Sequence, residues 1–207
     1  MQDPCNGSAQ QVQINYEDIP SATRALERHN VHTIISAIGL VSEDTSQSQL
    51  NLIEAAEQSK TTERFIPTDP LSSLQSLLHI DPSIKWWLDA ADSLKASSLQ
   101  YTRVIPGFFM DYWGMPLART NLQPYTFGVS LSHRVAIIPG DGNNVICMTY
   151  TYDMAKYVAR LLELDEWPEF SVIVGDQVTY NQLLEMAEEI RGKNLSQVFL
   201  ILFAPHH

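Results

Sequence analysis

Hydrophobic and polar positions follow a pattern that predicts strands alternating with helices along the first half of the chain. Residues 31–38 (VHTIISAI) are nearly all apolar or β-branched, which indicates a strand buried on both faces of a parallel sheet. The other predicted strands cover 12–14, 64–67 and 100–106, and the predicted helices begin after Asp18, at Ser46 and at Ser83. This β-α-β-α-β-α-β order predicts an α/β fold with a doubly wound parallel sheet.

The second half of the chain has a different pattern. Residues 135–138 and 145–149 flank the turn-forming segment PGDGNN and predict a hairpin. An amphipathic helix over about 154–162 comes next, followed by a strand over 171–174 and a Gly175-Asp176 turn. We expect one domain over 1–207, with a core over about 11–115 and a smaller substrate-side region over about 116–207.

The last predicted helix begins with a capping box formed by Thr179 and Gln182. Its spacing places four apolar side chains on the inward face: Leu183, Leu184, Ala187 and Ile190. The longest apolar run, residues 198–204 (VFLILFA), is far shorter than the roughly 20 residues that span a bilayer, so we expect no membrane partner. A buried strand is the alternative interpretation of this run.

Charge and cysteine content limit the classes of partner and location. The formal net charge is -11, and no cluster of Lys and Arg offsets it, so binding to nucleic acid is not expected. Two cysteines are too few for a disulfide framework, and no signal peptide opens the chain. A reducing, cytoplasmic location is therefore the expectation. The histidines have no metal-ligand spacing, so no metal site is predicted.

Three segments are candidates for ligand contacts. Gly140 and Gly142 lack the helix that must follow a phosphate-binding turn, so they are interpreted as a hairpin turn. Two segments end predicted parallel strands, where ligands of open α/β sheets bind. Their residues are Ser36, Ala37, Ile38 and Gly39 at the carboxyl end of the strand over 31–38, and Pro106, Gly107, Phe108 and Phe109 where the strand over 100–106 ends after Ile105. The simpler interpretation is a turn at Gly39 and two core phenylalanines.

Two further features could carry chemistry. Asp111, Tyr112 and Trp113 continue an aromatic stretch that could form the wall of a pocket for a planar substrate, or simply pack. Lys85 lies near a predicted helix start beside Trp86 and Trp87; a solvated lysine is the alternative to a catalytic one. No Ser/His/Asp constellation can be argued from the sequence.

An ordered set of motifs resembles the NmrA-like family, relatives of the isoflavone and phenylcoumaran reductases. The motifs run from about residue 12 to residue 193 and include VHTIISAIGL, RFIPTD, SLKASSLQYTRVIPGFFMDYWGMP, AIIPGDGN and VIVGDQVTYNQLLEMAEEIRGK. The resemblance implies an atypical short-chain dehydrogenase with a Rossmann-like fold. It also implies hydride transfer between a small molecule and a nicotinamide cofactor, with NADP(H) expected and NAD(H) as the alternative.

By position, the resemblance places the family's cofactor contacts on ten residues: Asn15, Tyr16, Ser36, Ala37, Ile38, Gly39, Pro106, Gly107, Phe108 and Phe109. The family's active-site lysine, counted back from LKASSLQYT, falls on Trp87, and Lys85 lies two residues earlier. Relatives of this kind in filamentous fungi serve secondary-metabolite pathways, with bulky aromatic or polyketide-like substrates. One branch is instead a redox-sensing regulator.

The family's opening strand, G-x-x-G-x-x-G turn and helix have no counterpart in this sequence, which begins just before what resembles the third strand. Residues 194–207 do not match the family either. Three hypotheses follow: an NAD(P)-dependent oxidoreductase, a non-catalytic sensor or protein-interaction regulator (or inactive copy), and a homo-oligomer in which another chain supplies the missing strands.

Overall fold

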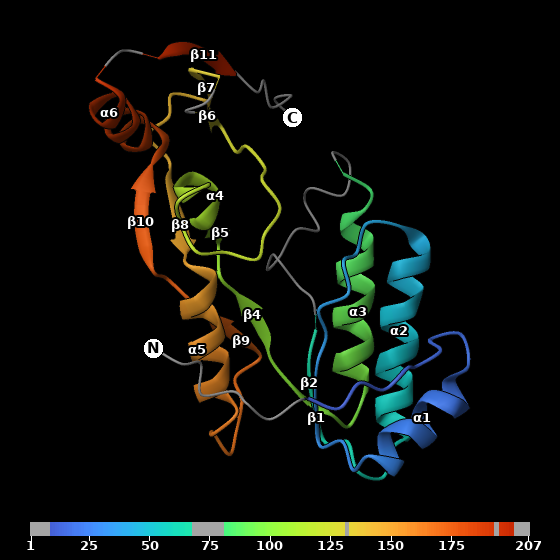
Figure 1. Cartoon of the computed structure of the whole chain (residues 1–207). Helices are drawn as coiled ribbons and strands as arrows, with labels where there is room; N and C mark the ends of the chain where they lie inside the picture. Colours follow the sequence, from blue (N-terminus) through green and yellow to red (C-terminus); the bar gives the residue numbers. More distant parts are fainter. Residues whose placement is uncertain (1–8, 68–80, 131–132, 193–194, 201–207) are drawn as a thin grey trace. The chain divides into compact units, whose positions relative to one another are not determined.

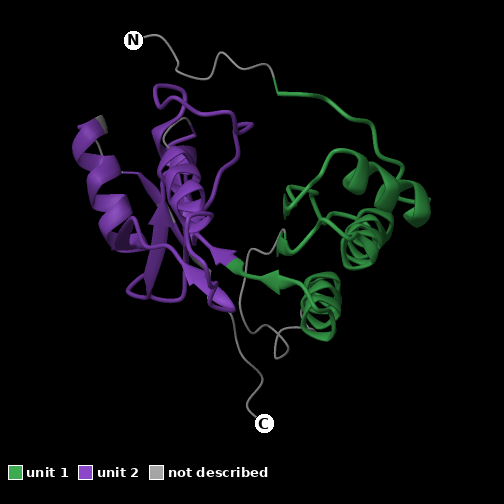
Figure 2. Ribbon diagram, turned by 90° about the horizontal axis from the view of Figure 1, so that it is seen from below, with its two compact units in different colours: residues 1–103 green, residues 104–207 purple. Residues whose placement is uncertain are grey.

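The computed structural model describes residues 9–67, 81–130, 133–192 and 195–200. The chain divides into two compact units, Met1–Arg103 and Val104–His207, which Figure 2 colours separately. Each unit is described by itself. The expected assignment of a core over about 11–115 and a substrate-side region over about 116–207 stays a prediction.

The described residues of unit 1 form a parallel sheet and three helices, which are labelled in Figure 1. The strands β1 (Thr33–Ile35), β2 (Arg64–Ile66) and β3 (Gln100–Tyr101) lie in the order β1-β2-β3, and all neighbours are parallel. The helices are α1 (Ile19–Arg28), α2 (Glu43–Gln58) and α3 (Ile84–Ala96). The α/β class with a parallel sheet is therefore confirmed.

The core of unit 1 joins all three helices to one face of the sheet. Ile34 of β1 and Phe65 of β2 are paired in register, and both side chains are buried against the helices. The helical side chains that share this core are Ala22, Leu26, Leu52, Ile53, Ala55, Ala56, Ala90 and Leu94. Burial of this apolar surface is the main driving force for the unit.

The helix starts of unit 1 follow from local capping. Asp18 caps α1 as predicted, because its carboxylate accepts a hydrogen bond from the backbone N–H of Ser21 at 3.0 Å. α2 begins three residues before the predicted start at Ser46, since Ser42 and Thr45 form a reciprocal capping box there. The buried Ser46 instead lies inside the helix.

Two strand predictions in unit 1 are wrong. Residues 9–17 form no strand, because Ile14 and Tyr16 pack against the helical core instead of a neighbouring strand. β1 is shorter than predicted, and Ile35 is 50% exposed, so the strand is not buried on both faces. The predicted loop over 68–82 lies outside the described residues except for its last two.

The described residues from the start of β4, at the boundary between the units, to the end of β11 form three small groups of strands, which are labelled in Figure 1. β4 (Arg103–Ile105) pairs with β9 (Phe170–Val172). The order β10-β8-β5 joins Asp176–Thr179, Val145–Thr149 and Phe108–Phe109. The order β11-β7-β6 joins Ser196–Leu200, Val135–Pro139 and Val129–Ser130. The helices are α4 (Asp111–Gly114), α5 (Thr151–Leu161) and α6 (Tyr180–Arg191).

The predicted hairpin over 135–149 is wrong. β7 pairs with β11 and β6, whereas β8 pairs with β10 and β5, so the two strands do not pair with each other. The connecting glycines do form a turn, since Gly140 and Gly142 both have positive φ and the Gly142 N–H bonds to the Pro139 carbonyl at 3.1 Å. The turn therefore carries the chain from one strand group to another.

The end of the chain confirms some predictions and corrects others. Thr179 and Gln182 form the predicted capping box, and Leu183, Leu184 and Ala187 are buried. Ile190 is 77% exposed instead, because the buried stripe of α6 ends at Ala187. β10 replaces part of the predicted Gly175-Asp176 turn, since Asp176 already pairs with Met148. Of the apolar run over 198–204, the first three residues belong to β11, and Val198 is 53% exposed rather than buried.

None of the helices in the described part of the chain is long and apolar enough to cross a membrane.

Candidate functional site

The segment after β1 is held in place by a buried hydrogen bond. The side chain of Ser36 is 8% exposed, and its hydroxyl donates to Oε1 of Gln49 on α2 at 2.8 Å. The Ser36 backbone N–H also donates to the Ile66 carbonyl at 2.8 Å, which extends the β1–β2 contact by one residue. Gln49 is fully buried, so the chain leaves the sheet at a fixed point.

The next three residues leave the backbone accessible. Ala37 and Gly39 are exposed, and Ile38 packs partly against the core. A methyl group added at Gly39 would meet no atom within 4 Å, so there is open space beside the backbone. The first turn of α2 carries Glu43 and Asp44, so this helix start disfavours a phosphate group.

Asn15 and Tyr16 occupy the turn before α1. The side-chain oxygen of Asn15 accepts a hydrogen bond from the Glu17 N–H at 3.0 Å. The Tyr16 carbonyl accepts one from Nδ2 of Asn51 on α2 at 2.8 Å, and the Tyr16 ring packs against the helical core. Asn51 therefore ties this turn to α2, the helix that also fixes Ser36.

Lys85 lies in the first turn of α3 with its side chain exposed. Its ammonium forms an ion pair with the carboxylate of Asp89, one turn further along the same helix. Trp86 and Trp87 are half-buried beside it. The structure therefore places Lys85 on a solvated helix face in an i,i+4 pair, and a catalytic role for it stays a prediction.

Residues 106–109 belong to unit 2, where they place β5 against β8. Gly107 has φ +67°, and a Cβ at this position would lie 2.3 Å from the carbonyl oxygen of Cys147. Phe108 pairs with Met148 and Phe109 with Thr149. Pro106 is buried. The glycine thus allows a close approach of two backbones, which is a structural reason for its presence.

One aromatic ring of β5 and four rings from later residues form an aromatic cluster: Phe108, Tyr112, Trp113, Tyr125 and Phe127. Phe127 lies at its centre, with ring centroids 5.0 Å from Tyr112, 4.7 Å from Tyr125 and 5.5 Å from Phe108. Edge-to-face and tilted geometries of this kind are the favourable ones. The sequence indicated the first three rings, but the distant Tyr125 and Phe127 lacked any periodic signal.

A cavity of about 440 Å³ opens beside the aromatic cluster, and all of its lining residues belong to unit 2. The lining residues are Tyr112, Trp113, Met115, Pro116, Pro124, Tyr125, Thr126, Val129, Ser130 and His133. This volume is within the range of small-molecule sites, and aromatic walls with a few polar groups are typical of them.

The polar groups of this cavity were missed by the sequence analysis. The Ser130 hydroxyl lies 2.9 Å from Nδ1 of His133, and Ser130 is 5% exposed. A serine and a histidine three residues apart are too common to signal a site. Their relevance comes from the fold, which places both on the wall of the aromatic cavity.

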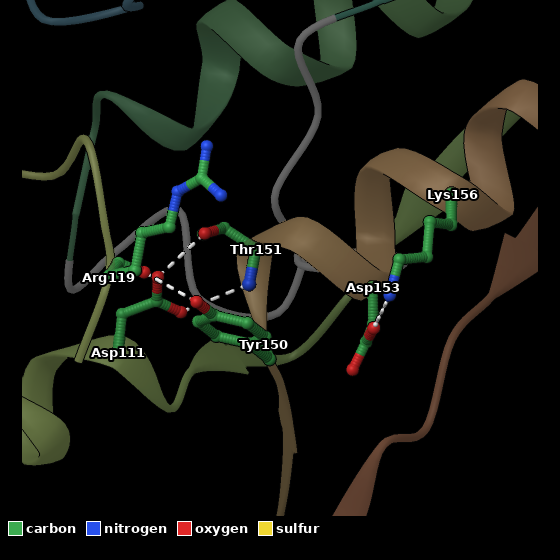
Figure 3. Close-up of polar contacts among 6 residues, drawn as sticks. All are labelled: Asp111, Arg119, Tyr150, Thr151, Asp153 and Lys156. Carbon is green, nitrogen blue, oxygen red and sulfur yellow. Dashed lines mark hydrogen bonds and ion pairs between the residues drawn. The ribbon is translucent and has the colours of Figure 1, made fainter. Parts of the chain in front are cut away.

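A second polar cluster anchors the loop that passes the cavity (Figure 3). The Asp111 carboxylate accepts hydrogen bonds from the Thr151 hydroxyl at 2.6 Å and from the Thr151 N–H at 3.0 Å. Tyr150 donates to the Arg119 carbonyl at 2.5 Å, and the Arg119 guanidinium lies 4.8 Å from the Tyr152 ring. These contacts tie residues 111–119 to the start of α5.

Burial and hydrogen bonding act in opposite directions on Asp111, which is 1% exposed. Burial alone would raise the pKa of its carboxyl, but the hydrogen bonds from Thr151 and Thr120 outweigh burial, so the pKa lies below its ordinary value of 3.8. Asp111 is therefore a charged anchor at the start of α5.

Comparison with known proteins finds relatives among oxidoreductases. Oxidoreductase BOA1 of Botryotinia fuckeliana is 32% identical over 183 residues, which cover 88% of this chain and 61% of that protein. Oxidoreductase swnN of Metarhizium robertsii is 29% identical, covering 90% and 62% respectively. Phenylcoumaran benzylic ether reductase TP7 of Nicotiana tabacum is 23% identical, covering 88% and 58%. The chain thus spans about 60% of the length of these relatives. No protein-family model matches it.

Solved structures show the same fold. The ternary complex of leucoanthocyanidin reductase from Vitis vinifera superposes with a TM-score of 0.69 at 15% identity, covering 92% of this chain and 63% of that one. A crystal structure from work on pinoresinol-lariciresinol and phenylcoumaran benzylic ether reductases gives a TM-score of 0.70 at 20% identity, covering 93% and 62%. At these identities the likeness establishes a Rossmann-like fold.

Proposed function

Because this chain belongs to the NmrA-like, isoflavone-reductase-like family, we propose that it is part of an NAD(P)-dependent oxidoreductase that acts on a bulky aromatic or polyketide-like substrate. The observation that carries the substrate class is the aromatic-walled cavity of unit 2. Its volume of about 440 Å³ suits a fused-ring or biaryl molecule better than a small hydroxy acid.

The walls of the cavity support a planar ligand. Tyr112 and Tyr125 line the cavity and contact Phe127 edge-on or tilted, so their orientation is constrained by the aromatic cluster. Rigid aromatic walls favour flat apolar rings, because stacking and edge contacts need little further ordering. Ser130, Thr126 and His133 add polar groups for an oxygen substituent.

The cofactor we propose is NADP(H), with NAD(H) as the alternative. The leucoanthocyanidin reductase relative of known structure is described as an NADPH complex, with a TM-score of 0.68. In this chain we propose that Ser36 to Gly39 contact the cofactor, because the backbone there is accessible and held in position by Gln49. We also propose cofactor contacts at Asn15, Tyr16 and residues 106–109, and only the family resemblance supports these. The cofactor would supply or accept a hydride.

A role in fungal secondary metabolism is part of the proposal. The relatives from Botryotinia and Metarhizium are both fungal proteins named as oxidoreductases. A cytoplasmic location, in which NADP(H) is abundant, is also proposed.

Calorimetric titration of the purified chain with NADPH and NADH, together with a thermal melt, tests the cofactor proposal. We expect micromolar binding and a raised melting temperature. Oxidation of NADPH is then followed with aromatic ketones and enones of two or three rings. A folded chain that binds neither nucleotide would refute the proposed oxidoreductase function.

A matched pair of variants tests the cavity. Phe127→Ala removes the centre of the aromatic cluster, and Tyr157→Ala removes an exposed ring on α5. We expect the first to raise the KM for a fused-ring substrate and the second to leave it unchanged. Equal effects of both variants would show that the substrate binds elsewhere.

A non-catalytic NAD(P)-sensing regulator is the second proposed function. The ion pair of Lys85 with Asp89 on an exposed helix face favours it, because a paired lysine there contributes no chemistry. Cofactor binding without turnover on any substrate, together with capture of a specific protein partner, would support this alternative. A homo-oligomer stays a prediction that the mass in solution tests.

A further inference from the structure

The wall of the cavity in unit 2 includes one histidine, His133. Three of its lining residues are titratable: Tyr112, Tyr125 and His133. Histidine is the side chain that ordinarily exchanges protons in the physiological range, whereas tyrosine does so near pH 10. Among the described residues that line the cavity there is no carboxylate and no lysine.

Ser130 holds the ring of His133 at the cavity wall. Its hydroxyl oxygen lies 2.9 Å from Nδ1 of the ring, and it also accepts a hydrogen bond from the His133 backbone N–H at 3.3 Å. Because Ser130 is 5% exposed at the end of β6, the hydroxyl has little freedom to move. β6 therefore fixes the position of Ser130, and Ser130 in turn orients the ring of His133.

A serine hydroxyl suits a partner whose protonation changes. It can donate to Nδ1 of a neutral imidazole, and it can accept from Nδ1–H of an imidazolium. The contact at 2.9 Å can thus persist in both states. His133 is also an exposed residue, which gives it access to solvent protons.

From this arrangement we propose that His133 is the catalytic acid–base residue of the cavity and that Ser130 is the positioning residue that orients its ring. The inference deepens the proposed oxidoreductase function and rests on it. It assigns proton transfer to a residue that the resemblance does not mark, in place of the ion-paired Lys85.

The proposed step balances as follows for a ketone substrate. When bound, the proposed nicotinamide cofactor would supply a hydride, which is two electrons and one proton, to the carbonyl carbon and would itself be oxidised. The C=O π bond breaks, and the oxygen takes a proton from the imidazolium of His133. The product is an alcohol, and the neutral imidazole regains its proton from water. In the oxidative direction His133 accepts the proton.

The groups around His133 define the expected pH dependence. Tyr112 of α4 and Tyr125 of the following loop line the same cavity, and Arg134 is the next residue in the chain. The β11 residue Ser196 bonds through its N–H to the Arg134 carbonyl at 3.1 Å. Because histidine is the side-chain type that ordinarily exchanges protons between pH 5 and 8, loss of the pH dependence in a His133 variant is the informative result.

His133→Asn tests the proposal, with His29→Asn as the matched control, since His29 is an exposed histidine after α1. We expect His133→Asn to lower kcat/KM by about 100-fold or more and to remove the pH dependence between 5 and 8, while NADPH affinity and the thermal melt stay unchanged. The control should behave like the natural chain. An unaltered rate and pH profile in His133→Asn would overturn the inference and leave the proposed function intact.

Ser130 has a separate readout. Ser130→Ala should shift the pH profile and lower kcat more than it changes KM, and Ser130→Thr should restore both because it keeps the hydroxyl. A purely structural serine would instead lower the melting temperature in both variants without moving the profile.

A binding measurement that needs no turnover distinguishes failure of the His133 proposal from failure of the proposed oxidoreductase function. The ring C–H resonances of His133, assigned by their loss in His133→Asn, are followed by NMR against pH with and without 2-acetylnaphthalene. We expect the probe to shift these resonances and their titration. If the probe does not bind, or binds and leaves these resonances unchanged, the inference is overturned whatever the cofactor does. Failure to bind both NADPH and NADH instead refutes the oxidoreductase function.

Discussion

The carboxylate of Asp111 accepts hydrogen bonds from both the N–H and the hydroxyl of Thr151, which lies forty positions further along the chain. Thr151 is the first residue of α5, so the charge of Asp111 lies at the positive end of that helix. The same contact fixes α4, from which Tyr112 and Trp113 reach the cavity. One buried carboxylate thereby links the aromatic wall to the next helix.

Asp111→Asn should destabilise the chain by about 1–3 kcal/mol, because it removes the charge from two hydrogen bonds in a buried place. The pKa of Asp111 is lowered in the folded state, so its contribution is present above the ordinary value of 3.8 and is lost as pH falls through the lowered value. The two proteins should converge in stability as the pH falls below 3.8 and through the lowered pKa of Asp111. Chemical denaturation at several pH values measures this, with Asp153→Asn, an exposed residue paired to Lys156, as the control.

Gly107 and Gly140 both have positive φ, but they differ in the space around them. A Cβ at Gly107 would lie 2.3 Å from the Cys147 carbonyl oxygen, whereas one at Gly140 would meet nothing within 4 Å. Gly140→Ala should cost roughly 1–2 kcal/mol from backbone strain alone. Gly107→Ala should cost clearly more, because β5 must also move away from β8. Equal losses of stability for the two variants in urea denaturation would show that β5 can move away from the Cys147 carbonyl at no further cost.

Gln49 and Gln47 lie on the same helix in different environments. Gln49 is fully buried and accepts from the Ser36 hydroxyl, whereas Gln47 is exposed and bonds to Asn51 one turn away. Gln49→Ala should cost about 1–3 kcal/mol and should weaken NADPH binding, since it frees the segment after β1. Gln47→Ala should change both by much less. Undiminished nucleotide affinity in a folded Gln49→Ala chain would argue against contacts at Ser36 to Gly39.

Lys85→Ala tests whether Lys85 is a catalytic lysine or only the exposed partner of an ion pair. Exposed ion pairs contribute about 0–1 kcal/mol, so the melt should barely change when the contact with Asp89 is lost. Because the ammonium is paired on a solvated face, we expect turnover within about threefold of the natural chain. The control is Lys95→Ala in the last turn of the same helix. A drop of about 100-fold, absent in the control, would instead assign the catalytic role to Lys85.

Local patterns predicted the elements of this fold better than their pairing. The caps at Asp18 and Thr179 and the parallel order of β1, β2 and β3 follow from residues close in sequence. The hairpin failed because strand pairing is decided by burial across the whole unit, and β7 finds its neighbour at residues 196–200. No alternation of polar and apolar residues carries that information.

The candidate site was likewise predicted only in part from the sequence. Phe108 and Tyr112 were indicated because they are near a strand end, where ligands of this fold class bind. Ser130 and His133 were not, because only the approach of β6 to the aromatic cluster places an ordinary serine and histidine at a cavity. A site built from loop residues has no spacing rule to reveal it.

The pairing of β7 with β11 can form only late in the synthesis of the chain. Val135 to Pro139 bond in parallel to a strand that begins at Ser196, about sixty residues later. While the ribosome is still making the intervening α5 and α6, this edge of β7 has no neighbour and displays unpaired backbone groups beside the half-exposed Ile137. A nascent chain that stalls before residue 196 would therefore be a target for chaperones, and silent changes that slow translation between residues 140 and 195 should lower the yield of folded protein more than the same changes before residue 100.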